Sequence, residues 1–264
     1  MKNYLVFLGT GGGRSVLYAQ VRATGGIYVS LDDLRFIIDP GPGSLVWFRK
    51  LKLPEPHGIL LSHLHIDHSN DVNVYLDGIK DPFLVAERHC VEQSEDRYPV
   101  VSKYHLKKVK SLMIVDPGSK VELPNGIKVE TTKADHYVPT VGFKISGSRI
   151  IGYTSDGPYF EGQEKPFEGS DIMIMNVLAP HGEKPLPKKH MTLDGAISFI
   201  NNLNDKPKLV ILSHFSFWIL RADVYKQAKI MERETGVKTI PADDFMKIDI
   251  DSLEKLKHDL KDFI

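Results

Sequence analysis

Cysteine is almost absent from this sequence, and so are long apolar runs and an excess of charge of either sign. Cys90 is the one cysteine among 264 residues, which excludes an intramolecular disulfide and a zinc site built from cysteines. No stretch reaches the roughly 18 consecutive apolar residues that a membrane-spanning helix needs. The 34 basic residues balance the 34 acidic ones, so the surface as a whole is not built to bind a polyanion.

The first residues also lack a targeting pattern. Met1 to Asn3 lead directly into an apolar run that begins at Tyr4, without the apolar core and cleavage site of a secretory signal. We therefore expect a soluble, cytoplasmic protein that does not associate with membranes. Composition leaves the number of subunits open, and a homodimer is among the expected states.

Short apolar runs alternate with amphipathic stretches along the chain. We predict strands at residues 4–8, 27–30, 34–38, 57–61, 82–86, 112–115, 121–123, 127–132, 141–146, 149–153, 171–178 and 209–212. We predict helices at residues 45–51, 71–79, 87–110 with a break near Pro99, 191–203, 222–234 and 251–263. Runs of strands followed by helices, twice over, predict one α/β domain over residues 1–264, with two sheets packed face to face and helices outside.

The closest grouping of histidine and aspartate residues comes directly after the predicted strand at 57–61. His63, His65, Asp67 and His68 follow one another within six residues. If the backbone stays extended, His63 and His65 project to the same side, and Asp67 and His68 then open a helix. Imidazole and carboxylate groups suit a divalent metal such as zinc. A solvated histidine-rich loop is the alternative, and the spacing favours the metal site.

The segment His63-Leu64-His65-Ile66-Asp67-His68 resembles the signature of the metallo-β-lactamase-fold hydrolases. Later positions match in the same order, so the resemblance extends over nearly the whole chain. It implies a four-layer αββα sandwich of two mixed β-sheets with outer helices.

Four further positions at strand ends match motifs of that family, namely Asp39, His136, Asp156 and His214. From the residues alone, either aspartate could simply form a turn, and a lone histidine after a strand is more often structural. The resemblance implies that His136, Asp156 and His214 are metal ligands. It implies that Asp39 supports the segment from His63 to His68 without being a metal ligand itself.

The resemblance implies two zinc ions, with manganese or iron as alternatives. One ion would be held by His63, His65 and His136, and the other by Asp67, His68 and His214, with Asp156 and a hydroxide bridging them. Such a pair of ions lowers the pKa of bound water to about 7. It also stabilises both the attacking and the leaving oxygen of an in-line displacement. Asp67 would also orient the hydroxide, which gives it a catalytic role.

His190 precedes Met191 and Thr192 at the start of a predicted helix. This His-x-Thr pattern resembles a motif of the phosphodiesterase branch of the fold, which contains the RNase Z tRNA 3′-endonucleases and the PhnP-like cyclic phosphodiesterases. In that branch the histidine contacts the substrate phosphate and is the candidate proton donor to the leaving group. The resemblance therefore implies a catalytic role for His190, and a surface histidine in a lysine-rich loop is the alternative.

Two features depart from the endonucleases. Their Glu-Ala-Thr, whose glutamate supports the catalytic histidine, is replaced by Met175-Asn176-Val177, so that support is absent or supplied differently. Only residues 137–155 lie between His136 and Asp156, which leaves no room there for the long RNA-gripping insertion that the endonucleases usually carry. The short interval and the balanced charge favour a small substrate over tRNA.

We therefore predict a dinuclear-zinc hydrolase that acts on a small phosphodiester, either cyclic or a nucleotide. Its partner would be a small, phosphate-containing molecule. The alternatives are a hydrolase of carboxylic esters, lactones or thioesters, an RNase Z-like tRNA 3′ endonuclease, and a mononuclear-iron oxygenase of the same fold. A scaffold or sensor without activity is disfavoured, because every ligand position of the family is filled.

Overall fold

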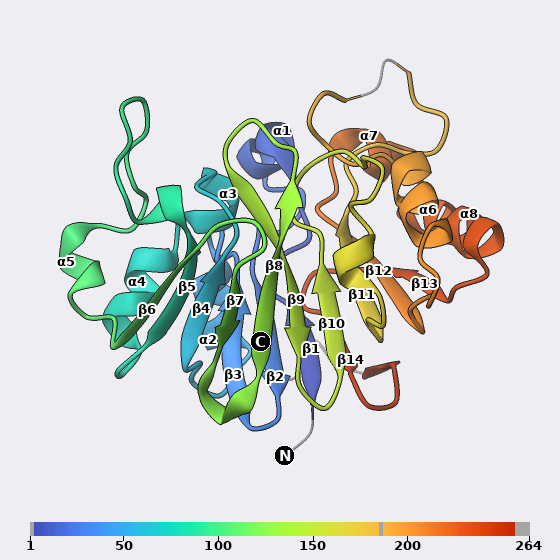
Figure 1. Cartoon of the computed structure of the whole chain (residues 1–264). Helices are drawn as coiled ribbons and strands as arrows, with labels where there is room; N and C mark the ends of the chain where they lie inside the picture. Colours follow the sequence, from blue (N-terminus) through green and yellow to red (C-terminus); the bar gives the residue numbers. More distant parts are fainter. Residues whose placement is uncertain (1–2, 185–186, 257–264) are drawn as a thin grey trace. The chain divides into compact units, whose positions relative to one another are not determined.

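The structure, a computed structural model, describes residues 3–184 and 187–256. The described strands form two sheets, and the chain divides into two compact units that contain one sheet each (Figure 1). Unit 1 comprises the described residues of 1–10, 22–116 and 243–264, and unit 2 comprises those of 11–21 and 117–242. Two mixed sheets with helices are what the sequence predicts, while the single domain over 1–264 stays a prediction.

Unit 1 contains an eight-stranded sheet in the order β15-β14-β1-β2-β3-β4-β5-β6. Its strands are β1 (Tyr4–Phe7), β2 (Ile27–Leu31), β3 (Leu34–Ile38), β4 (Gly58–Leu61), β5 (Phe83–Glu87), β6 (Ser111–Val115), β14 (Lys247–Asp249) and β15 (Glu254–Leu256). The pairs from β3 to β6 are parallel and the other pairs are antiparallel. Strands β3 and β4 therefore end at the same edge, where Asp39 and Ser62 follow them.

The helices of unit 1 are α2 (Ser44–Lys50), α3 (Ile66–Ser69), α4 (Val72–Gly78), α5 (Lys103–Leu106) and the short 3₁₀ helix η1 (Arg88–Cys90). Helices α2 and α4 pack on one face of the sheet. Alternate residues of β4, Ile59 and Leu61, join a buried apolar cluster with Phe48 of α2 and Leu76 of α4. This alternation is what a strand with a helix-covered face requires.

Unit 2 contains a seven-stranded sheet in the order β13-β12-β11-β10-β9-β8-β7. Its strands are β7 (Lys120–Glu122), β8 (Lys128–Ala134), β9 (Thr140–Ser146), β10 (Ile150–Tyr153), β11 (Ile172–Asn176), β12 (Leu209–Ser213) and β13 (Thr239–Pro241). The pairs from β10 to β13 are parallel, and those from β7 to β10 are antiparallel. Strands β8, β10, β11 and β12 therefore run in one direction and end at one edge of the sheet.

The helices of unit 2 are α1 (Gly13–Ala19), α6 (Leu193–Asn201), α7 (Phe217–Arg221), α8 (Val224–Thr235) and the 3₁₀ helices η2 (Pro124–Gly126) and η3 (Lys165–Phe167). Helices α6 and α8 cover one face near β11 to β13 (Figure 1), where Phe199 and Met231 join Met173 and Leu212 in a buried cluster. Helix α6 begins after Thr192, whose Oγ1 accepts the backbone N–H of Gly195 (3.0 Å), close to the predicted start.

The long helix predicted over residues 87–110 is wrong. The structure has only η1 and α5 there, and residues 91–102 form a loop that projects from unit 1 between β5 and α5 (Figure 1). The Asn73 side chain donates to the Val100 carbonyl (2.8 Å) and accepts the N–H of Ser102 (2.9 Å). Since these backbone groups bond a side chain from α4, they are not available for a helix ladder.

The C-terminal helix predicted over 251–263 is wrong for residues 251–256, and residues 257–263 lie outside the described part. Strand β15 occupies 254–256 and pairs with β14. The Asp249 side chain accepts the N–H groups of Asp251 (3.0 Å) and Ser252 (2.9 Å), which is the local bonding of an aspartate turn. Helices α1 and α7 and strands β13 and β14 were not predicted.

Across residues 3–184 and 187–256, no helix is long and apolar enough to cross a membrane.

Candidate metal centre

Asp39 and Ser62 connect two predicted ligands of unit 1. Asp39 Oδ1 accepts the backbone N–H of Ser62 (2.7 Å), and Oδ2 accepts both the Ser62 hydroxyl (2.6 Å) and the Nδ1–H of His68 (3.0 Å). Because that hydroxyl donates to Asp39, its oxygen accepts the Nδ1–H of His63 (2.9 Å). All four side chains are buried. This network assigns the proton of both imidazoles to Nδ1, so Nε2 is the nitrogen with which each could coordinate a metal ion.

His65 and Asp67 lie beside these histidines at the end of β4. The ring of His63 lies 4.9 Å from that of His65 and 4.2 Å from that of His68, measured between centroids. Asp67 Oδ2 lies 3.9 Å from His68 Nε2. Asp67 and His68 belong to α3, as the sequence predicts. Unit 1 therefore gathers its four predicted ligands and Asp39 in one place.

Gly41 allows the loop after β3 to pass directly along the backbone of α3. A Cβ atom at this position would lie 2.0 Å from the carbonyl oxygen of Asp67, which no side chain can tolerate. Any larger residue at position 41 would displace the turn that carries Asp67 and His68.

In unit 2, two interactions tie the segment around His136 to the loop before α6. His136 Nδ1 donates to the carbonyl oxygen of Lys189 (2.7 Å), and the Lys189 ammonium group is paired with Asp135. Asp156 Oδ2 lies 3.8 Å from His136 Nε2. His136 therefore has the same tautomer as His63 and His68, and its Nε2 points toward the Asp156 carboxylate.

Asp156 is held by Asn176, the last residue of β11. Asn176 Nδ2 donates to Asp156 Oδ1 (2.8 Å) and to the Tyr153 hydroxyl oxygen (3.1 Å), and both Asp156 and Asn176 are buried. These bonds fix Oδ1, so Oδ2 faces the histidines. The distances from Oδ2 are 3.2 Å to His214 Nε2, 3.7 Å to His190 Nδ1 and 3.8 Å to His136 Nε2.

The supporting role of Asn176 was not predicted, although the sequence carried a signal. A polar residue ends a strand whose other residues are apolar, which is also the pattern that marks Asp39 and His214. It lies in the stretch that departs from the endonucleases, and the structure shows that its amide supports the aspartate.

His190 lies among the histidines of unit 2 and not on an exposed loop surface. Its ring centroid is 4.8 Å from that of His136 and 6.4 Å from that of His214, and its side chain is 19% exposed. The nitrogen nearest to Asp156 is Nδ1. The ring of His190 is therefore turned with Nδ1, and not Nε2, toward the Asp156 carboxylate.

His214 packs against the glycine-rich segment that precedes α1. A Cβ atom on Gly12 would lie 2.3 Å from Cδ2 of the His214 ring, and the Gly12 N–H donates to the Phe215 carbonyl (3.0 Å). Only glycine allows this approach, so the backbone at Gly12 packs directly against the His214 ring.

Several of these residues, or their direct neighbours in sequence, have a strained backbone. Asp39, Ser155, Lys189 and His214 all have positive φ, at 49°, 56°, 60° and 62°. For a residue other than glycine, the left-handed conformation costs on the order of 1–2 kcal/mol. Strain of this kind clusters at functional sites, where the surrounding structure holds it in place.

The sequence matches the family model described as "Beta-lactamase superfamily domain" over residues 34–215, well over half of the chain. The chain belongs to the beta-lactamase superfamily. An uncharacterized protein of Methanocaldococcus jannaschii is 31% identical to it over 260 residues, which cover 95% of this chain and 96% of that protein.

Three solved structures resemble this one in fold. The metallo-beta-lactamase fold protein YhfI from Bacillus subtilis has a TM-score of 0.72 at 17% identity, and the match covers 94% of this chain and 99% of YhfI. A diphosphatase from the PhnP family has a TM-score of 0.66 at 20% identity, with 94% and 97% covered. Human tRNase Z, short form, has a TM-score of 0.67 at 18% identity, with 94% and 99% covered. The predicted metallo-β-lactamase fold is thus confirmed.

Beta-lactamase superfamily members are metal-dependent hydrolases, and each unit of this chain has side chains that could hold a metal ion. Two groups have donor atoms that all lie within 4.8 Å of one another, namely Asp39, His63 and His68 in unit 1, and His136, Asp156 and His190 in unit 2. Imidazole nitrogens and carboxylate oxygens fit zinc, manganese or iron. In the first group Asp39 already bonds the Nδ1 side of His68, which fits a supporting residue better than a ligand.

Proposed function

We propose that this protein is a dinuclear, zinc-dependent phosphodiesterase of the beta-lactamase superfamily that hydrolyses a small phosphodiester, either cyclic or a nucleotide. The ions would be held by His63, His65, Asp67, His68, His136, Asp156 and His214. Bound ions of this kind lower the pKa of water to about 7 and stabilise negative charge at phosphorus. The family motifs support this ligand set, and so do the Nδ1 hydrogen bonds of His63, His68 and His136.

The placement of His190 is the observation that carries the phosphodiesterase proposal. The residue stands in a His-x-Thr sequence before α6, and its ring lies against His136 with Nδ1 toward Asp156. A phosphate bound next to these groups would meet Nε2 of His190. From that atom the imidazolium would donate a proton to the leaving-group oxygen, which is the step that limits cleavage of a poor leaving group.

Asp67 would act on the other reacting group, the attacking water. Its carboxylate is partly exposed, at 13%, next to the buried His68. A carboxylate can accept a proton from water and hold it in line for attack. The proposal therefore assigns Asp67 to the nucleophile and His190 to the leaving group.

Two features support a small substrate over tRNA. The segment between His136 and Asp156 is strand β9 and a tight turn into β10, so it holds no RNA-gripping arm. The loop over residues 91–102, which projects from unit 1 (Figure 1), carries Glu92, Glu95 and Asp96 but only Arg97 as a basic residue. An acidic projection repels a nucleic-acid backbone.

A substrate panel tests the proposal. The zinc-loaded protein would be assayed on bis-p-nitrophenyl phosphate, a 2′,3′-cyclic nucleotide, a lactone, a thioester and precursor tRNA at physiological salt. We expect the two small phosphodiesters to have the highest kcat/KM, and a His63→Ala, His65→Ala double variant to be inactive on all of them. A higher kcat/KM on the lactone or thioester would replace the proposal with a carboxylic ester hydrolase. Specific cleavage at the tRNA 3′ end with a higher kcat/KM would replace it with an endonuclease.

A further inference from the structure

Tyr137 is a large aromatic residue that remains exposed next to the candidate catalytic residues of unit 2. It is 58% exposed, although it directly follows the buried His136. Its ring centroid lies 5.5 Å from that of His136 and 6.2 Å from that of His190, and both contacts are edge-to-face. The ring therefore borders the place where we propose that phosphate binds, with most of its surface open to solvent.

The backbone on both sides of Tyr137 is held in place. On one side, Asp135 and His136 are tied to Lys189, through its ammonium group and its carbonyl oxygen. On the other side, the Thr140 hydroxyl donates to the Val138 carbonyl (2.8 Å). A flat side chain on a fixed backbone binds another flat group at little cost in conformational entropy.

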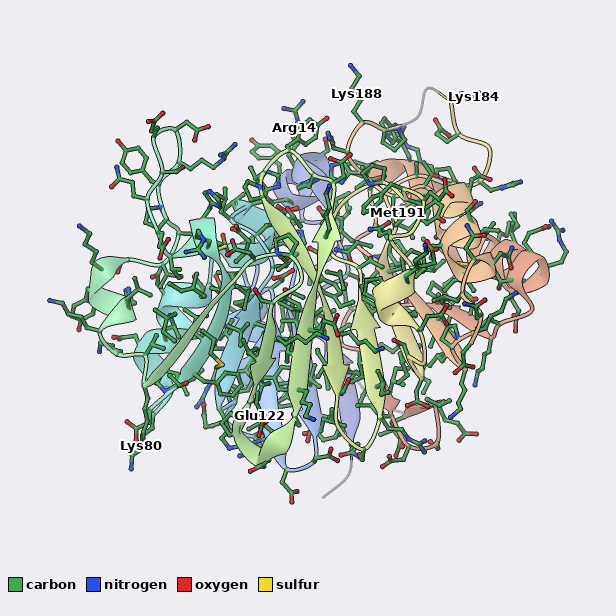
Figure 2. The ribbon with its side chains drawn as sticks, in the orientation of Figure 1. Arg14, Lys80, Glu122, Lys184, Lys188 and Met191 are labelled. Carbon is green, nitrogen blue, oxygen red and sulfur yellow. The ribbon has the colours of Figure 1, made fainter. Side chains whose placement is uncertain are left out.

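Basic side chains of unit 2 lie at the same end of its sheet. Figure 2 shows Arg14, Lys184 and Lys188 projecting at one end of the sheet. All three are exposed. Strand β8 runs toward this end, and the segment that contains His136 follows it. Positive charge at this end attracts an anionic ligand. The exposed Tyr137 ring would in addition contact a flat, apolar group of that ligand, which a simple anion lacks.

We propose that Tyr137 is the stacking surface for a nucleobase, so that the preferred substrates of the proposed phosphodiesterase are nucleotides. The inference rests on the proposed function and narrows it. The phosphate lies at His190, and the base covers the open face of the neighbouring tyrosine. Stacking tolerates every base because each has a π-face, so the subsite selects for the presence of a base and not for its identity.

Binding of two matched ligands tests the subsite separately from catalysis. AMP and ribose 5-phosphate share a phosphate and a sugar and differ by the adenine. Their dissociation constants would be measured by calorimetry on the zinc-loaded protein and on three variants. Tyr137→Ala removes the ring, Tyr137→Phe keeps it, and Tyr225→Ala removes a tyrosine that is also exposed, at 51%, but lies on α8.

We expect the unaltered protein to bind AMP more tightly than ribose 5-phosphate. Tyr137→Ala should weaken AMP binding by about 5- to 150-fold and largely abolish the preference, while Tyr137→Phe and Tyr225→Ala should keep it. The subsite is ruled out if the unaltered protein binds both ligands equally, or if Tyr137→Ala weakens both by the same factor.

The two proposals fail in different ways. A protein that hydrolyses bis-p-nitrophenyl phosphate but shows no Tyr137-dependent preference for AMP keeps the proposed function and loses the subsite. A protein that prefers AMP through Tyr137 but cleaves no phosphodiester keeps the subsite and loses the proposed function.

Discussion

Asp39 is the single residue of unit 1 on which most of the local hydrogen bonding converges. Its two oxygens hold the backbone and hydroxyl of Ser62 and the ring of His68, and through Ser62 they also fix His63. One carboxylate thus sets the tautomer and the orientation of two predicted ligands.

Asp39→Ala should weaken zinc retention by about 10–100-fold, because both imidazoles lose the acceptor that orients them. Competition with a chromophoric chelator measures the change. Asp81→Ala is the matched control, since Asp81 is an exposed aspartate of unit 1 that also has positive φ and pairs only loosely with Lys110, at 3.8 Å. Unchanged zinc affinity in a folded Asp39→Ala protein would show that the network does not support a metal.

Asn176 plays the corresponding part in unit 2, with an amide in place of a carboxylate. Asn176→Leu keeps the size of the side chain but removes the donor to Asp156 Oδ1. We expect zinc affinity to fall by roughly tenfold, the low end of the losses seen for such supporting groups. Asn201→Leu, on the surface of α6, should not change it. Equal affinities in the two variants would rule out the positioning role.

Single residues were predictable to the extent that they stand at recognisable spacings. The cluster from His63 to His68 is visible because its members are adjacent in sequence, and the later positions are visible because each follows a strand in a context that resembles a family motif. Ser62 and Asn176 were not assigned, because their roles depend on which atoms of different strands meet. That information appears only when the sheets are formed.

Among the elements, the loop that precedes α6 is the one that carries His190, to which we assign a catalytic role. It places His190 through the bonds between Lys189, Asp135 and His136. His190→Ala should lower kcat on a phosphodiester with a poor leaving group by about 10²–10⁴-fold, the usual contribution of a general acid, with zinc content unchanged. His181→Ala is a control in the same loop, because His181 is paired with Asp194 at 2.6 Å and should retain turnover.

Leaving-group dependence decides between the roles of His190. A p-nitrophenyl ester, whose leaving group needs no proton, should be affected much less than an alkyl ester. An equal loss on both esters would contradict proton donation, and loss of zinc from His190→Ala would make the residue a ligand.

Strands β10 and β11 are joined at their starts by a charged side chain. Asp171 accepts the N–H of Ile150 (2.9 Å) and the ammonium of Lys208 (2.7 Å). Burial acts to raise the pKa of this carboxyl, but the bonds to Lys208 and Ile150 outweigh burial and hold the pKa below its ordinary value.

A carboxyl whose pKa is lower in the folded state stabilises the protein above its unfolded pKa, near 4, and loses that contribution as the pH falls through the folded pKa. Asp171→Asn should therefore lower the free energy of unfolding by about 0.5–1 kcal/mol at pH 7. The difference should shrink as the pH falls through the folded pKa of Asp171. Urea unfolding over a series of pH values measures it, and a difference that does not depend on pH would contradict the ionic origin.

Elements were predicted well where their ends have local signals. Helix α6 starts at its Thr192 cap, and α8 ends at Gly236, both close to the predicted positions. The helix predicted over 87–110 does not form in the structure. Asn73, which is distant in sequence, instead hydrogen-bonds the backbone of Val100 and Ser102. Strands β13 and β14 were missed because three-residue strands carry too little periodicity.

For the whole molecule, the proposed ligand set implies a fixed metal content. We expect two zinc ions per chain after removal of metal and full reloading, measured by plasma mass spectrometry. Asp156→Asn should reduce retention, because it replaces the carboxylate on which three histidines converge, whereas Asp194→Asn should not. One ion per chain at saturation would exclude the dinuclear centre, and iron in protein purified without added metal would favour the oxygenase alternative.

The position of β1 in its sheet has a consequence for how the protein is made. β1 is the first strand of the chain, yet it pairs on one side with β14, where Leu5 lies opposite Ile248. During synthesis, one edge of the apolar segment Tyr4–Phe7 therefore stays without this partner until residues 247–249 have been translated. An open strand edge is a template for association with other chains. Strand β14 thus covers this edge of β1, and we expect chains that stop before Lys247 to aggregate more readily because they lack that cover.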